Sequence, residues 1–248
     1  KSGIRIQVLF TVLELEVTMS QSNSDYCFLL HQRSYGETSI IADVFTENYG
    51  KISIIAKGAK KPRSKFFGYL VPFQKLNVTF SGRSELKTLT SIDRNLAETS
   101  NTFSKVSYSL LYINELLIRL LPKDAKHQEL FFLYEKFLKS IIDKNNLELT
   151  LRHFELDLLD MLGYGFDYQL DIDFNLPIDP ETSYVFVKEK GFRKSKNSNF
   201  YGKDIINIKN RKLEDVSLKI LKEITTKAIS ICLEGKDLRS RKIFKSIK

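Results

Sequence analysis

The stretch between Lys51 and Lys75 contains seven lysines and arginines and no aspartate or glutamate. Five of the seven fall within residues 57–65, where Gly58 and Pro62 favour a loop over a regular element. Lysine and arginine side chains on an accessible loop neutralise the phosphates of a nucleic-acid backbone. This composition makes nucleic acid the first partner to consider.

Aromatic residues are interleaved with these cations. An exposed ring can stack on a base of any identity, so rings beside cations are typical of surfaces that bind nucleic acid without sequence preference. Phe45 and Phe73 are assigned to a hydrophobic core instead. The candidate base-stacking rings are Tyr35, Tyr49 and Phe66.

The remaining reactive side chains form no catalytic pattern. The three histidines fall in different expected elements, and none has a cysteine or aspartate at metal-ligand spacing. Asp171 and Asp173, with Asp167 and Asp179, could hold magnesium for phosphodiester cleavage, but a solvated acidic loop is the preferred interpretation. No glycine-rich phosphate loop precedes a Lys-Ser or Lys-Thr pair. We therefore expect a binding protein rather than an enzyme, with no catalytic residues.

The elements that must carry the cations are short strands. Alternating or β-branched apolar runs, separated by turn residues, predict five strands within about 70 residues. They cover residues 26–31, 38–45, 52–56, 76–80 and 86–92. This pattern favours a five-stranded barrel of the oligonucleotide-binding (OB) type. Its ligand face would hold Arg33, the cations of residues 57–65, Lys75, Arg83 and Lys87.

After residue 101 the apolar period changes from two to about 3.6, which predicts packed helices. They are expected at residues 108–120, 128–144, 147–162 and 213–233. The expected class is therefore α+β, with an OB domain at residues 25–100 and an all-helical domain at 101–248. An irregular insertion interrupts the helical domain near residues 166–203. Residues 1–24 form an extension, either an extra strand or a non-native segment.

Composition sets the class of protein and the compartment. The 248 residues carry a net charge of +9, and no apolar run approaches the roughly 20 residues that cross a bilayer. Cys27 and Cys232 lie far apart and are interpreted as small hydrophobic residues, which fits a reducing cytoplasm. The cationic surface falls in residues 51–75, 186–212 and 234–248, beside an acidic block at 101–185. This separation favours an anionic polymer as partner over a generally lysine-rich surface.

Nine segments, in chain order from residue 25 to about 247, resemble the RecO family of bacterial recombination mediators. They are LLHQRSYGETS at 29–39, DVFTE at 43–47, AKGAK at 56–60, GYLVPF at 68–73, GRSELKTL at 82–89, LYINEL at 111–116, RHFEL at 152–156, LGYG at 162–165 and LRSRK at 238–242. The specificity of the resemblance lies in the whole set, and residues 1–24 are outside it.

The resemblance implies an N-terminal OB domain, a helical C-terminal domain and no bond-breaking activity. It implies binding of single- and double-stranded DNA and annealing of complementary strands, in the bacterial cytoplasm at the nucleoid. It also implies contact with the acidic, phenylalanine-ending tail of the single-strand-binding protein SSB. With RecR, the protein would help RecA replace SSB on gapped DNA.

Carried over residue by residue, the resemblance assigns DNA contacts to the basic residues of the barrel and of the C-terminal tail. Those in the barrel are Arg33, Lys57, Lys60, Lys61, Arg63, Lys65 and Arg83. The expected ligand face of the barrel adds Lys75 and Lys87 to these candidate contacts. Those in the tail are Arg239, Arg241 and Lys242, which could instead meet an acidic peptide.

One departure from the family bears on metals. Many members carry four zinc-binding cysteines in the region that matches residues 167–199, where this sequence has none. We therefore predict no structural metal and no cofactor. Two other functions stay open: a scaffold that docks acidic protein tails, and a magnesium-dependent nuclease that uses the acidic loop.

Overall fold

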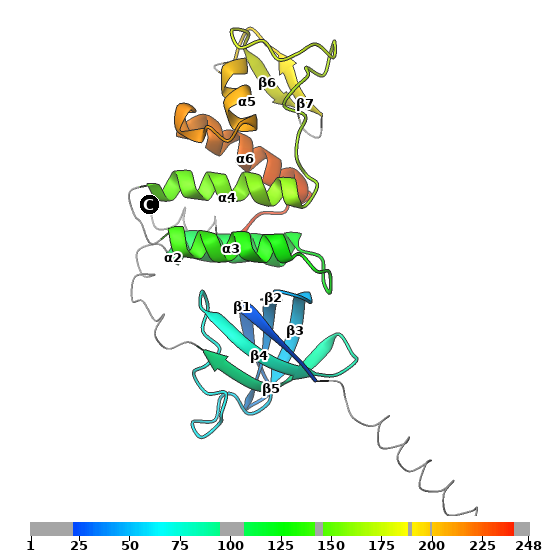
Figure 1. Cartoon of the computed structure of the whole chain (residues 1–248), viewed down its shortest axis with the longest axis vertical. Helices are drawn as coiled ribbons and strands as arrows, with labels where there is room; N and C mark the ends of the chain where they lie inside the picture. Colours follow the sequence, from blue (N-terminus) through cyan, green and yellow to red (C-terminus); the bar gives the residue numbers. More distant parts are fainter. Residues whose placement is uncertain (1–21, 95–106, 142–145, 188–189, 199, 241–248) are drawn as a thin grey trace, which may run out of the picture. The chain divides into compact units, whose positions relative to one another are not determined.

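The computed structural model describes residues 22–94, 107–141, 146–187, 190–198 and 200–240 (Figure 1). The chain divides into two compact units. The first contains the barrel and the segment Pro122–His127, and the second contains the helices and the remaining strands. The predicted boundary near residue 100 stays a prediction, because it falls outside the described residues. So does most of the predicted extension, of which residues 22–24 begin the first strand.

Five strands form the closed barrel of the first unit. They are β1 (Ser22–Tyr35), β2 (Ser39–Thr46), β3 (Gly50–Ala56), β4 (Lys75–Ser81) and β5 (Leu86–Arg94). The order around the barrel is β1-β2-β3-β5-β4, and all neighbours are antiparallel except β3 and β5. The predicted OB-type barrel is confirmed.

Alternation of side chains builds the barrel core, because successive residues of a strand face opposite sides. Ala42 and Val44 of β2 and Ile52 and Ile54 of β3 point inward and are almost fully buried. The intervening residues face outward. The period-two runs of the sequence are the cause of this arrangement.

A bulge in β1 decides which side chains reach the outer surface. The register between β1 and β2 shifts between Leu29 and His31, which leaves Leu30 without a paired residue in β2. Beyond the bulge, Arg33 pairs with Ile41, whose neighbours in β2 face the core. Strict alternation from Leu29 would have turned Arg33 inward, so the bulge places Arg33 outside the barrel.

The second unit is built on α2 (Ser107–Leu120), α3 (Gln128–Ser140), α4 (Leu147–Met161) and α6 (Leu218–Cys232). Helix α4 packs against both α3 and α6. The single helix predicted at residues 213–233 is wrong in one respect. Val216 has an extended backbone and is buried, which separates a short 3-10 turn, η4 (Leu213–Asp215), from α6. The apolar spacing continues across this break, which is why the sequence indicated one helix.

The predicted irregular insertion is more ordered than expected. It contains a hairpin of β6 (Tyr184–Val187) and β7 (Gly191–Lys194), followed by α5 (Gly202–Lys209), which lie together in Figure 1. The second domain is therefore helical with a small added sheet. Rings from both strands of the hairpin join a buried cluster with Phe200. In the part of the chain that the structure describes, no helix has the length and apolarity to cross a bilayer.

Candidate nucleic-acid interface

The cations of residues 57–65, here called the basic loop, follow β3 directly. Successive turns shape the loop: the Lys61 amide donates to the Gly58 carbonyl at 2.9 Å, and the Ser64 amide donates to the Lys61 carbonyl at 2.9 Å. Ala59 within the loop and Phe66 just after it are buried in the barrel core. The sequence predicted a loop here, and these anchors fix the basic loop on the barrel.

Two lysines of the basic loop hold it in place. The Lys60 ammonium donates to the Gly36 carbonyl in the β1–β2 turn at 2.9 Å, and the Lys60 amide donates to the Thr38 carbonyl at 2.9 Å. The Lys65 ammonium donates to the Thr90 carbonyl of β5 at 2.6 Å. Hydrogen bonds from a charged donor are stronger than those between neutral groups. Lys60 and Lys65 therefore position the loop as well as adding charge to it.

The other three cations of the basic loop are Lys57, Lys61 and Arg63. All three side chains are exposed, and none of these side chains makes a hydrogen bond or an ion pair with any described residue. A charged group without a protein partner is available to an anionic ligand, and it gives up no internal contact on binding. These three side chains are therefore candidates for phosphate contact, grouped on one loop of the barrel.

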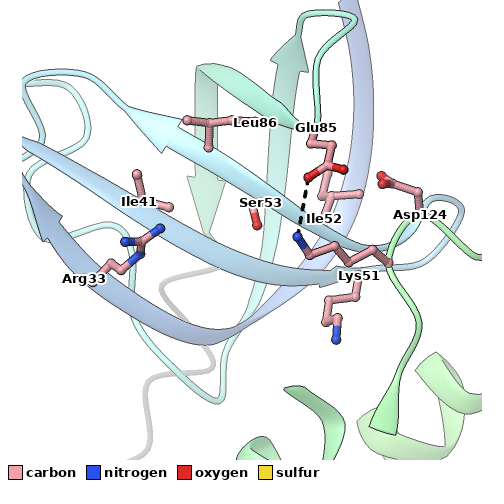
Figure 2. A pocket seen from close by; sticks show the side chains of 9 residues that line it. Arg33, Ile41, Lys51, Ile52, Ser53, Glu85, Leu86 and Asp124 are labelled. Atoms are coloured by element: carbon pink, nitrogen blue, oxygen red, sulfur yellow. Dashed lines mark ion pairs between the residues drawn. The ribbon is translucent and has the colours of Figure 1, made fainter. Parts of the chain in front are cut away.

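A groove of about 180 Å³ lies on the outer face of the barrel (Figure 2). OB folds bind their ligands on this face, across strands 2 and 3. The groove is lined by Arg33, Ile41, Lys51, Ile52, Ser53, Glu85, Leu86, Lys123 and Asp124. Figure 2 shows Arg33 beside Ile41, away from Glu85 and Asp124. The lining thus contains three cationic and two carboxylate side chains. The Glu85 carboxylate lies 3.6 Å from the Lys123 ammonium. The groove is far less cationic than the basic loop.

Two cations of the groove, Lys51 and Lys123, were missed as site residues. Lys51 stands in the acid-free stretch, but nothing in the sequence separates it from the other lysines there. Burial lowers the pKa of Lys51, although Asp43 opposes the shift. Lys123 belongs to the connection between α2 and α3, and no sequence signal shows that this connection returns to the barrel.

The segment Pro122–His127, here called the strap, is fixed to the start of β3. The Asp124 amide donates to the Lys51 carbonyl at 3.0 Å, and the Lys126 ammonium donates to the Asn48 side chain at 3.2 Å. Gly50 has a φ of +68°, and a Cβ at this position would collide with the Ala125 carbonyl oxygen. The strap can approach β3 only because residue 50 is glycine.

Replacing Gly50 with alanine is therefore expected to displace the strap. The left-handed backbone alone costs about 1 to 2 kcal/mol, and the collision should raise the loss of unfolding free energy to about 3 kcal/mol. Trypsin should also cut faster after Lys123. The matched control is Gly36→Ala, where φ is +56° and no atom lies within 4 Å of the added Cβ. Equal destabilisation by both variants would show that the strap does not press on Gly50.

The other predicted residues do not gather in one place. Tyr35 ends β1 and so lies beside the β1–β2 turn. The basic loop lies at the same end of the barrel, because the Lys60 ammonium donates a hydrogen bond to this turn. Tyr49 lies in the β2–β3 turn, at the opposite end of β2, and its ring contacts Phe80 edge-on at 5.3 Å between centroids. Arg83, in the β4–β5 turn, lies toward this second end, since β5 enters the sheet beside Ser53.

Two further predicted cations sit partly within the barrel surface. The Lys75 ammonium lies 4.9 Å from the centre of the Tyr26 ring. Lys87 is half-buried near the start of β5. Neither is as accessible as the three exposed cations of the basic loop.

Phe66 was predicted to stack on a base, and the structure contradicts this. Its ring is only 7% exposed and belongs to the barrel core, so it cannot reach a ligand without leaving that core. Tyr35 and Tyr49 are 53% and 38% exposed and stay in the predicted set. The sequence could not tell the two neighbouring phenylalanines, Phe66 and Phe67, apart.

The tail residue Arg239 is held in the second unit by Glu115 of α2. The Glu115 carboxylate accepts the Arg239 and Ser240 amides, both at 2.8 Å, and the Ser240 hydroxyl at 2.7 Å. Burial would raise the pKa of Glu115, but these hydrogen bonds hold the pKa below its usual value. The Arg239 side chain is exposed. The predicted contacts Arg241 and Lys242 lie outside the described residues.

Two aspartates of the acidic loop that was considered as a magnesium site, Asp171 and Asp173, make contacts within the protein. Asp171 is almost fully buried, and one of its carboxylate oxygens accepts the Asp173 and Phe174 amides at 3.1 and 2.7 Å. Asp173 is paired with Arg193 at 3.0 Å. Among the residues that the structure describes, no three His, Cys, Asp or Glu side chains are grouped as metal ligands would be.

Two family models match the chain. Residues 19–95 match Recombination protein O N terminal, and residues 104–242 match Recombination protein O C terminal. A protein of Photobacterium profundum, described as DNA repair protein RecO, is 39% identical over 222 residues, which are 88% of this chain and 94% of that protein. The protein of the same description from Haemophilus influenzae (strain 86-028NP) is 38% identical over 228 residues, 90% of this chain and 96% of that protein.

Proposed function

The chain belongs to the RecO family of DNA repair proteins, and from this premise we propose that it is a recombination mediator. It binds single- and double-stranded DNA and anneals complementary strands. With RecR it helps RecA displace SSB from gapped DNA, and it contacts the C-terminal tail of SSB. It works in the bacterial cytoplasm at the nucleoid and breaks no bonds.

The basic loop is the observation that carries this proposal. It presents Lys57, Lys61 and Arg63 to solvent on a backbone that is pinned to the barrel. Cations on a fixed protein backbone can contact the phosphates of DNA. Such contacts position a strand without reading its sequence. A strand held by its phosphates keeps its bases accessible, as annealing requires.

The alternative function is a scaffold that docks acidic protein tails. The exposed Arg239, whose backbone Glu115 fixes, favours this alternative, because it belongs to the second unit whereas the basic loop belongs to the first. Such a scaffold would need no DNA contact from the barrel.

Annealing of two labelled complementary strands, each coated with SSB beforehand, tests the proposal. We expect the chain to accelerate pairing without ATP, as followed by fluorescence. SSB that lacks its C-terminal tail serves as the control, because it separates tail docking from DNA contact. An unchanged annealing rate, combined with retained binding of the isolated tail peptide, would replace the mediator by the scaffold.

A further inference from the structure

Phe67 is an exposed ring directly after the basic loop. Half of its surface is open to solvent, whereas the preceding ring, Phe66, is buried in the barrel core. The Phe66 ring therefore lies in the core and the Phe67 ring at the surface. Because Phe66 already occupies the core, the Phe67 ring stays exposed to solvent.

The backbone beneath Phe67 is held in a defined shape. The Phe67 amide donates to the Ser64 carbonyl at 3.1 Å, and the Tyr69 amide donates to the Phe66 carbonyl at 3.2 Å. Gly68 takes a left-handed conformation, with a φ of +73°, and Leu70 is buried again. Buried residues on both sides thus hold the ring at a fixed place on the surface.

An exposed ring alone is ordinary on a protein surface. Phe67 differs because it follows the exposed cations Lys61 and Arg63 by a few residues, in a stretch of chain without acidic residues. A rigid ring loses little conformational freedom when a second flat group stacks on it. Cations that hold phosphates would bring the bases of the same strand to this ring.

We propose that Phe67 stacks on an unpaired base of a strand whose phosphates the basic loop holds. This inference rests on the proposed function and adds the chemical class of the ligand group, a nucleobase of a single strand. Bases of a duplex are already stacked on their neighbours, so the ring adds affinity for single strands only. Phe67 thereby takes the stacking role that the sequence had assigned to Phe66.

The test compares an ordinary oligonucleotide with an abasic strand of the same length, which has the phosphates but no bases. Phe67→Ala should weaken binding of the ordinary strand about 5- to 150-fold, the usual range for one stacked base. Binding of the abasic strand should change less than about twofold, and the salt dependence of both should be kept. Phe67→Trp should retain the preference for bases. Phe132→Ala is the control, because that ring is similarly exposed on α3.

The outcomes separate this inference from the proposed function. If the unaltered chain binds neither strand, the proposed function fails, and the stacking role fails with it. If the unaltered chain binds both strands and Phe67→Ala leaves their affinity ratio unchanged, the stacking role alone is overturned. The inference is supported if Phe67→Ala lowers the ratio of affinities for the ordinary and the abasic strand, and Phe67→Trp retains it.

Discussion

Reversing the charges of Lys61 and Arg63 to glutamate is expected to weaken binding of single-stranded DNA by about 30- to 100-fold at low salt. Both side chains are exposed and have no partner among the described residues, so the change should not disturb the fold. Each reversal removes an attraction to a phosphate and adds a repulsion, each of about 0.5 to 0.7 kcal/mol at an exposed site. Fluorescence anisotropy of a labelled strand measures the effect.

A control with the same change in net charge is Lys136→Glu combined with Lys219→Glu. These lysines lie on α3 and α6, outside the three cationic segments of the sequence. The control should keep most of the affinity, because phosphate contact is local whereas net charge acts through a screened field. Equal losses in both double variants would mean that overall charge, and not the basic loop, holds DNA.

Replacing Glu155 with alanine is expected to destabilise the helical unit by about 3 to 5 kcal/mol, the usual result of breaking a buried ion pair. Glu155 of α4 is fully buried and lies 2.7 Å from the Arg152 guanidinium. It also accepts the Tyr112 hydroxyl of α2 at 2.6 Å, while Arg152 donates to Thr225 of α6 at 2.7 Å. The network joins three helices, and its loss leaves the Arg152 charge buried.

Urea unfolding followed by helical circular dichroism measures this loss. Glu148→Ala is the control on the same helix, because Glu148 is half-exposed and its ion pair with Lys222 is long, at 3.9 Å. That variant should cost less than about 1 kcal/mol. A Glu155→Ala variant as stable as the Glu148→Ala variant would contradict the importance of the network.

The strands of the barrel were predictable because their apolar residues alternate, and the helices because theirs recur every three or four residues. Features that depend on distant contacts were not predictable. The bulge at Leu29 and the break at Val216 both occur inside apolar patterns that continue unchanged in the sequence. The second strand of the β6–β7 hairpin is too short and too polar for its pattern to indicate a strand.

The candidate site was predictable only at the level of composition. The acid-free stretch identified the basic loop, but the carbonyls of Gly36 and Thr90 decide that Lys60 and Lys65 are anchors. The strap brings Lys123 to the groove by a tertiary contact that leaves no trace in the local sequence. Neighbouring residues of one type, such as Phe66 and Phe67, can be separated only by burial.

The affinity of the unaltered chain for single-stranded DNA across a salt series tests the central claim most directly. If Lys57, Lys61 and Arg63 each neutralise one phosphate, the logarithm of affinity should fall linearly with the logarithm of salt concentration, with a slope of about −2 or steeper. Reversal of Lys61 and Arg63 should make the slope shallower. A slope near zero for the unaltered chain would contradict phosphate binding by the basic loop.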